Sequence, residues 1–157
     1  MRYNKDMKCR RRGLTLIEMM VTVAIIAIIV AAYIIVANPA GQLASSRNNS
    51  RALNLETLIV EIRQNIGDHG NETFSCISGP IPTSTTNMGS AAGSYNIAPC
   101  LVPDYLPVLP FDPSASSAHY TSVSDYNTGY SIIQNASGSI TLSAPYAELK
   151  QTISTTR

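Results

Sequence analysis

Glu18 has chemistry that does not match its surroundings. It lies within residues 14–37, a segment of 24 residues in which it is the only charged side chain. A charge at the centre of a membrane-spanning helix costs about 2.5–3.5 kcal/mol on insertion scales. We therefore expect a function and a cationic partner for this carboxylate. The alternative is a glutamate close enough to the bilayer edge to reach water.

Catalytic chemistry is not indicated elsewhere in the chain. The sequence has no CxxC, HExxH, GxGxxG, P-loop or GxSxG motif, and its only histidines are His69 and His119. A hydrolase triad of His119, Asp112 and one of many serines has no distinctive spacing. We therefore do not expect an enzyme.

The chain is asymmetric in charge. Its 157 residues have a net charge of +1, and only 13% are charged, about half the ~25% of an average soluble domain. The first twelve residues hold six of the eleven Lys and Arg side chains and one acid, whereas the rest carries five basic and nine acidic side chains. This balance does not favour nucleic-acid binding. The length also argues against a barrel or a doubly wound enzyme.

The apolar run is long enough to cross a membrane. Residues 14–37 would extend about 36 Å as a helix, more than the ~30 Å hydrocarbon core. A secretory signal peptide, the alternative, has a shorter apolar region of about 7–15 residues followed by a cleavage site. The basic head predicts a cytoplasmic N-terminus with residues 40–157 outside.

The junction between the basic head and the apolar run resembles a known signal. Gly13-Leu14-Thr15-Leu16-Ile17-Glu18, preceded by three arginines, is similar to the class III signal of type IV pilins and pseudopilins. The first mature residue in that family is usually Phe, and here it is Leu14. The resemblance covers about residues 8–40.

This resemblance implies processing and assembly. A prepilin peptidase would cut after Gly13 and methylate the new amine of Leu14, and Glu18 would pair with that amine on a neighbouring subunit. The chain would then be a subunit of a type IV pilus or a type II secretion-like filament, with other pilin-like subunits, an inner-membrane assembly platform and its ATPase as partners. The alternative is an uncleaved, membrane-anchored exported binding domain.

Beyond the apolar run the helical pattern continues. Asn38-Pro39-Ala40-Gly41 predicts a kink. Apolar residues then recur at helical spacing up to Gly67, which we expect to end the helix: Leu43, Leu55, Leu58, Ile59, Ile62 and Ile66. We expect this stripe to be buried in a core.

The remaining 91 residues, 67–157, are rich in Pro, Gly, Ser and Thr. Residues 129–134 and 139–143 predict a hairpin across the turn 135–138, and residues 118–123 predict a third strand. We therefore expect an α+β ladle, in which a long helix packs on a small antiparallel sheet. The expected segments are a cleaved cytoplasmic leader 1–13, a membrane helix 14–37, a kinked continuation 38–66 and an exported domain 67–157.

Three cysteines divide between the two sides of the membrane. Cys9 lies in the leader, whereas Cys76 and Cys100 lie on the oxidising side, 24 positions apart. We expect these two to form a disulfide, with free thiols as the alternative.

A calcium site is the remaining hypothesis. The resemblance extends to pseudopilins that hold calcium in C-terminal loops, and Asp104, Asp112 and Asp125 are carboxylates of the kind that a hard cation prefers. The favoured alternative is that Asp112 and Asp125 stabilise turns. No other cofactor is expected.

Overall fold

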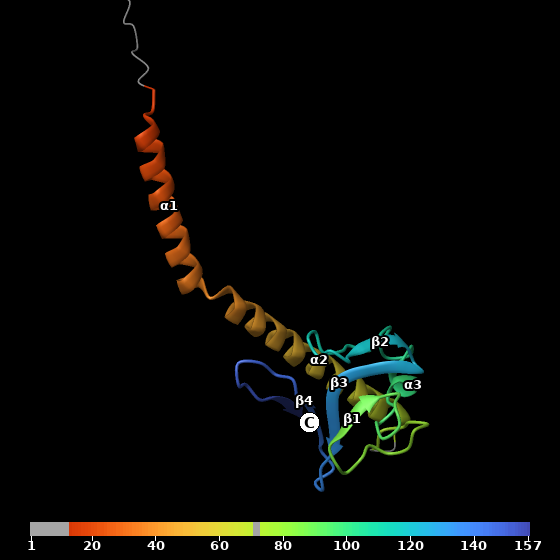
Figure 1. Cartoon of the computed structure of the whole chain (residues 1–157). Helices are drawn as coiled ribbons and strands as arrows, with labels where there is room; N and C mark the ends of the chain where they lie inside the picture. The colour runs from red at the N-terminus through yellow and green to blue at the C-terminus, as the bar shows by residue number, and fades with distance from the viewer. Residues whose placement is uncertain (1–12, 71–72) are drawn as a thin grey trace, which may run out of the picture. The chain divides into compact units, whose positions relative to one another are not determined.

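The computed structural model describes residues 13–70 and 73–157 (Figure 1). The chain divides into two compact units, Met1–Pro39 and Ala40–Arg157. Most of the expected leader, including Cys9, lies outside the described residues.

The described part of the first unit contains one helix, α1 (Leu16–Ala37). Thr15 is its N-cap and has an extended backbone. The helix ends at Asn38, whose φ of 39° and ψ of 62° are left-handed. Asparagine tolerates this conformation better than most residues, and the following proline disfavours a helical Asn38. The helix therefore breaks at the expected place.

Helix α2 (Pro39–His69) follows, and all of it except Pro39 belongs to the second unit. Proline suits the first position of a helix because the amide hydrogen that it lacks has no partner there. The helix continues through Gly67, which we expected to end it, to His69. Gly70 follows with a φ of 63°, the left-handed conformation that ends many helices and that glycine adopts without strain.

The rest of this unit is a small antiparallel sheet and a short helix. The elements, in chain order, are β1 (Thr86–Gly89), α3 (Ala98–Leu101), β2 (His119–Ser122), β3 (Asp125–Gln134), β4 (Ile140–Ala144) and β5 (Ile153–Thr156). The strands pair in the order β1-β3-β4-β5, and β2 also pairs with β3. With α2, this sheet forms the α+β layout that the sequence predicts.

The core lies between α2 and the sheet. Leu55, Leu58, Ile59 and Ile62 of the predicted stripe are buried, whereas Leu43 is 61% exposed. The sheet, its loops and α3 contribute further large buried side chains, among them Met88, Tyr95, Ile97, Leu101, Leu109, Tyr126, Tyr130, Ile132 and Leu142. The stripe is therefore mainly core.

The predicted strands are present. The β3–β4 hairpin pairs Ser131 with Ser143 and Gln134 with Ile140, and β2 occupies four of the six residues proposed for the third strand. The strands β1 and β5 and the helix α3 were not predicted. They are four residues each, and β1 (TNMG) and β5 (ISTT) have little of the apolar alternation that indicates a strand.

Candidate functional site

Gly13 and Leu14 precede the first turn of α1. Leu14 is 67% exposed. Among the described residues, nothing lies within 4 Å of a Cβ atom added to Gly13. The packing of residues 13–70 and 73–157 therefore gives no steric reason for glycine at this position.

Glu18 is the third residue of α1 and is exposed. Its backbone N–H donates to Thr15 Oγ1 at 3.3 Å, and the amide of Met19 donates to the Thr15 carbonyl at 3.2 Å. Thr15 and Glu18 have the T-x-x-E spacing of a capping box. This places the carboxylate at the positive end of the helix dipole.

The rest of α1 suits an apolar environment. None of its residues is buried within the chain. Thr22, the next polar residue after Glu18, donates its hydroxyl to the Met19 carbonyl at 2.9 Å, so its hydrogen bond is made inside the helix. By length and composition, the described chain has one helical segment able to span a membrane, at the N-terminal end.

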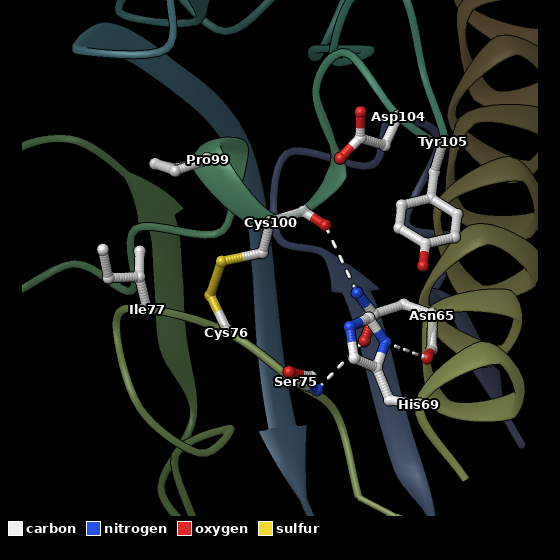
Figure 2. A pocket seen from close by; sticks show the side chains of 9 residues that line it. All are labelled: Asn65, His69, Ser75, Cys76, Ile77, Pro99, Cys100, Asp104 and Tyr105. Atoms are coloured by element: carbon white, nitrogen blue, oxygen red, sulfur yellow. Dashed lines mark hydrogen bonds between the residues drawn. A yellow bond between two sulfur atoms is a disulfide. The ribbon is translucent and has the colours of Figure 1, made fainter.

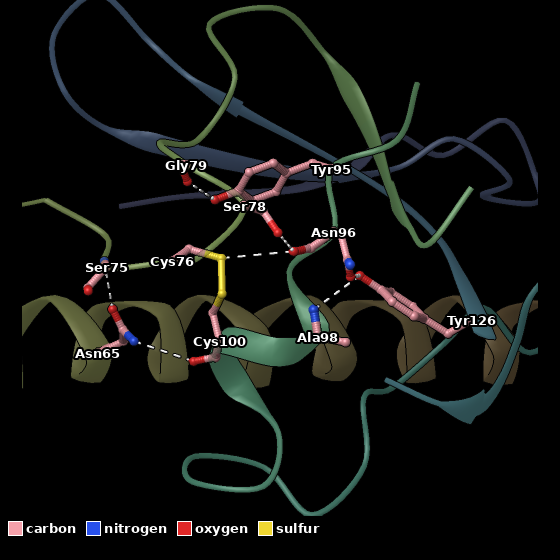
Figure 3. Close-up of a disulfide and its surroundings, with 10 residues drawn as sticks. All are labelled: Asn65, Ser75, Cys76, Ser78, Gly79, Tyr95, Asn96, Ala98, Cys100 and Tyr126. Atoms are coloured by element: carbon pink, nitrogen blue, oxygen red, sulfur yellow. Dashed lines mark hydrogen bonds between the residues drawn. A yellow bond between two sulfur atoms is a disulfide. The ribbon is translucent and has the colours of Figure 1, made fainter. Parts of the chain in front are cut away.

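A disulfide joins Cys76 to Cys100, the pairing that the sequence predicts (Figure 3). It links the segment that follows α2 to the short helix α3. Asn65 of α2 holds both segments, because its Nδ2 donates to the Cys100 carbonyl at 3.4 Å and its Oδ1 accepts from the Ser75 amide at 2.9 Å. The disulfide therefore strengthens a junction that hydrogen bonds already define.

A pocket of about 200 Å³ lies beside this disulfide (Figure 2). His69 lines it, with Nδ1 2.8 Å from the Asn65 carbonyl oxygen. Asp104 and Tyr105 line it as well. These side chains form no arrangement of nucleophile and base.

The three candidate calcium ligands do not meet. Asp104 lines the pocket, Asp125 lies 3.3 Å from His119 Nε2, and Asp112 binds Arg51. Among the described residues, no group of three or more His, Cys, Asp and Glu side chains is arranged to hold a metal ion. His119 and Asp112, the histidine and aspartate considered for a hydrolase triad, therefore have different partners.

Arg51 and Asp112 form an ion pair inside the second unit. Both side chains are fully buried, with Arg51 Nε 2.7 Å from Asp112 Oδ2 and Nη2 3.1 Å from Oδ1. Asp112 Oδ1 also accepts from the amides of Ser114 and Ala115. Burial opposes ionisation, but the hydrogen bonds from Arg51 and these amides outweigh it and lower the pKa of Asp112. Asp112 is thus a turn residue with a buried partner.

Glu148 extends this ion pair to the surface. Arg47 donates to it through Nε at 2.7 Å and Nη2 at 2.6 Å, and Arg51 Nη1 donates at 3.1 Å. The hydrogen bonds from Arg47 are the main cause that lowers the pKa of Glu148 to about 2. Asn48 joins the network by accepting from Arg51 Nη1 at 2.7 Å.

Sequence reasoning missed this network and the helix cap. A signal for each was present. Arg51 lies four and seven residues before Leu55 and Leu58, so it falls on the buried stripe as a charged residue that needs a partner. Thr15 and Glu18 have the capping-box spacing.

The comparisons with known proteins bear on the N-terminal segment. Residues 8–34 match the family model described as "Prokaryotic N-terminal methylation motif". No curated protein and no solved structure matches the chain significantly. The motif indicates a structural subunit rather than an enzyme, and with the apolar helix it fits a membrane-anchored pilin-type protein. The chain carries the prepilin-type signal of type IV pilins and pseudopilins.

Proposed function

We propose that this protein is a structural subunit, a pilin or pseudopilin, of a type IV pilus or a type II secretion-like filament. The observation that carries the proposal is the match of residues 8–34 to the methylation motif. A prepilin peptidase cuts after Gly13 and methylates the amine of Leu14. The mature chain then begins two residues before α1.

Assembly proceeds through α1. The helix is apolar on all sides and buries none of its residues within the chain, so lipid or neighbouring helices must cover it. Transfer from lipid to a helix bundle offers no large hydrophobic gain, because lipid tails are as apolar as leucine. An assembly platform and its ATPase therefore drive the step.

Glu18 pairs with the amine of Leu14 on a neighbouring subunit. Glu18 lies in the first turn of α1 and is exposed, so a charge on a neighbouring chain can reach it. Two opposite charges in an apolar environment are tolerated mainly when they are matched. The pair therefore sets the register of one subunit on the next.

Before assembly the subunit is a single-pass protein of the inner membrane. Its N-terminus is cytoplasmic, as the basic head favours, and the unit that follows α1 lies outside. After assembly it is part of an extracytoplasmic filament.

The Glu18→Val variant tests this proposal. We expect normal insertion, because removing the charge favours the membrane by about 2 kcal/mol on insertion scales, and normal cleavage, but no filaments. Filaments sheared from cells are counted against the abundance of the subunit in the membrane fraction. Thr22→Val is the matched control, because the Thr22 hydroxyl bonds within its own helix. Normal filaments from Glu18→Val would make Glu18 an edge residue without a role in assembly.

A membrane-anchored exported binding domain is the second candidate. The observation that favours it is the second unit, which has a core and an ion network of its own. In this case the leader remains on the chain, and α1 serves only as an anchor.

A further inference from the structure

We propose that strand β5 exchanges between two copies of the chain. In the exchanged pair, the turn at residues 148–151 opens, and β5 of each copy pairs with β4 of the other. The interaction surface is the edge of β4, and the partner is the second unit of another copy. This inference goes beyond the proposed function and does not depend on cleavage after Gly13 or on a filament.

The turn at residues 148–151 has a backbone that its sequence does not favour. The Gln151 amide donates to the Glu148 carbonyl at 3.1 Å, so the two residues between them form the centre of a tight turn. These residues, Leu149 and Lys150, have φ of 56° and 57°. Tight turns with two positive φ values strongly favour asparagine, aspartate or glycine at both positions. The closed turn is therefore strained, and opening it releases that strain.

Asn48 of α2 holds the closed turn at both ends. Its Nδ2 donates to the Glu148 carbonyl and to Gln151 Oε1, each at 2.8 Å, and its Oδ1 accepts from the Glu148 amide at 2.9 Å. Arg47 and Arg51 bind the Glu148 side chain. Glu148 is therefore fixed on its own copy, and the strained pair that follows it is the hinge. Short hinge loops under strain favour exchange of the element that they carry.

Strand β5 is held mainly through its backbone. It lies at one end of the sheet order, and among the described strands it pairs only with β4. Ala144 lies opposite Ile153, and Ile140 and Arg157 exchange both backbone hydrogen bonds, at 2.7 and 3.0 Å. In Figure 1 the end of the chain, marked C, lies beside β4. Backbone pairing of this kind is the same whichever copy supplies the strand.

The side chains of β5 add few contacts. Ile153 is its only apolar residue and is partly buried. Thr155 Oγ1 donates to Glu56 at 3.3 Å, and Arg157 forms an ion pair with the same carboxylate. The strand packs incompletely on α2, since a cavity of about 170 Å³ is lined by Ala52, Leu55, Glu56, Ile153, Ser154 and Thr155. An identical strand from a second copy can therefore replace all of these contacts.

Two opposing quantities set the balance between the closed and the exchanged form. Exchange conserves the contacts of β5 and releases the strain of the turn, whereas association of two chains costs translational and rotational entropy. The exchanged fraction should therefore rise with the concentration of the chain. It should also change when the hinge residues are replaced.

Cysteine trapping between two differently tagged chains tests the exchange. Ser143 of β4 lies opposite Ser154 of β5, and opposite residues of paired strands have Cα atoms close enough for a disulfide. One chain carries Ser143→Cys and the other Ser154→Cys, both with Cys9→Ser. The full chains are co-expressed in cells without a prepilin peptidase, extracted in mild detergent and oxidised with copper phenanthroline, so the result is independent of processing.

We expect the mixed dimer in about tenfold or greater excess over the two dimers of like chains, because exchange brings only the unlike cysteines together. Peptide mapping identifies the bond between positions 143 and 154. Dimers in the proportions of random pairing would show that the copies touch without exchange. Absence of dimers would show that β5 stays on its own chain. Either result would overturn the proposal.

Two further variants serve as controls. Ser139→Cys replaces Ser143→Cys in the matched control, since Ser139 is four residues away, about 13 Å along a strand, and is partly buried like Ser143. We expect no excess of the mixed dimer with this variant. A chain with both Ser143→Cys and Ser154→Cys tests the fold, because its cysteines meet in the closed and the exchanged form alike. If this chain forms no disulfide, the pairing of β4 with β5 is contradicted, and the proposal with it.

Substitutions in the hinge should change the mixed dimer in opposite directions. Leu149→Gly with Lys150→Gly removes the strain of the closed turn, because glycine adopts a positive φ freely, and should lower the mixed dimer by about threefold or more. Lys150→Pro should raise it, since proline fixes φ at about −65° and cannot form the closed turn. A mixed dimer that responds to neither change would contradict the hinge and overturn the exchange that depends on it.

Discussion

Helix α1 and the unit that follows it show opposite relations between charge and burial. In α1, 22 residues of almost entirely apolar sequence bury none of their side chains within the chain. In the second unit, a charged pair, Arg51 and Asp112, is fully buried. Apolar side chains are therefore exposed on α1, whereas charged side chains are buried in the second unit.

This difference indicates what each region is adapted to. In the proposed function, molecules outside the chain explain the apolar residues of α1 and the glycine at position 13: lipid, neighbouring helices and a peptidase. The interior of the second unit accounts for Arg51 and Asp112. Substitutions near α1 should therefore change processing or assembly without changing stability, and substitutions in the buried network should do the reverse.

The largest expected effect is loss of processing in Gly13→Val. A Cβ at this position meets none of the described residues within 4 Å, so the substitution should leave the fold of the second unit intact. A peptidase that grips an extended backbone leaves no room for a branched side chain at the cut. Co-expression with a prepilin peptidase, followed by gel electrophoresis, should show only the longer precursor. Cleavage equal to that of the native chain would refute the assignment of the cut. An altered thermal midpoint would contradict the expectation that substitutions near α1 leave stability unchanged.

Asp112→Ala should give the largest loss of stability. It leaves the Arg51 guanidinium buried without the carboxylate of Asp112. Removing one partner of a buried ion pair lowers the free energy of unfolding by about 3–5 kcal/mol. The free energy of unfolding is measured by denaturant titration of the full chain in detergent. Asp125→Ala is the control, because the Asp125 side chain is 64% exposed. Equal losses in the two variants would show that the buried pair contributes nothing of its own.

Removal of the disulfide should have a comparable or smaller effect. Closing a loop of 24 residues stabilises by about 3–4 kcal/mol in the chain-entropy model. The double variant Cys76→Ser, Cys100→Ser should be more sensitive to protease in the second unit, whereas insertion and cleavage remain normal. The oxidised and reduced native chains provide the matched comparison. Equal protease resistance of the oxidised and reduced chains would show that the disulfide does not stabilise the second unit.

Acid should have the smallest effect in this series. The pKa values of Asp112 and Glu148 are lower in the folded chain than in the unfolded chain, that of Glu148 being about 2. Their contribution to stability is therefore complete above the unfolded values near 4 and is lost as the pH falls toward 2. Denaturant midpoints should be flat from pH 7 to about 5 and then decline. The decline should be shallower in Glu148→Gln, and an identical decline would assign it to other groups.

Local patterns predicted much of the fold. The apolar run, the break at Asn38 and the β3–β4 hairpin each depend on residues close together in sequence. The end of α2 was misplaced, because two glycines were available and only Gly70 adopts the left-handed conformation. A glycine inside a helix costs only about 1 kcal/mol, which packing of a stripe can offset.

Apart from the disulfide, specific contacts between residues distant in the sequence could not be predicted. Arg51 and Asp112 are 61 positions apart, and Arg47 and Glu148 are 101 apart. No periodicity in either segment specifies its partner. The same holds for β5, whose Ser and Thr residues gain strand character from pairing with β4. The sequence thus predicted the apolar segment α1 better than the ion network inside the second unit.

In the proposed function, α1 and the residues just before it are adapted to processing and assembly. The most direct test is the intact mass of the native chain in the membrane fraction of cells that contain a prepilin peptidase, with N-terminal sequencing of the same sample. The account predicts a chain that begins at a methylated Leu14. A chain that begins at Met1 would contradict it and support the uncleaved anchor.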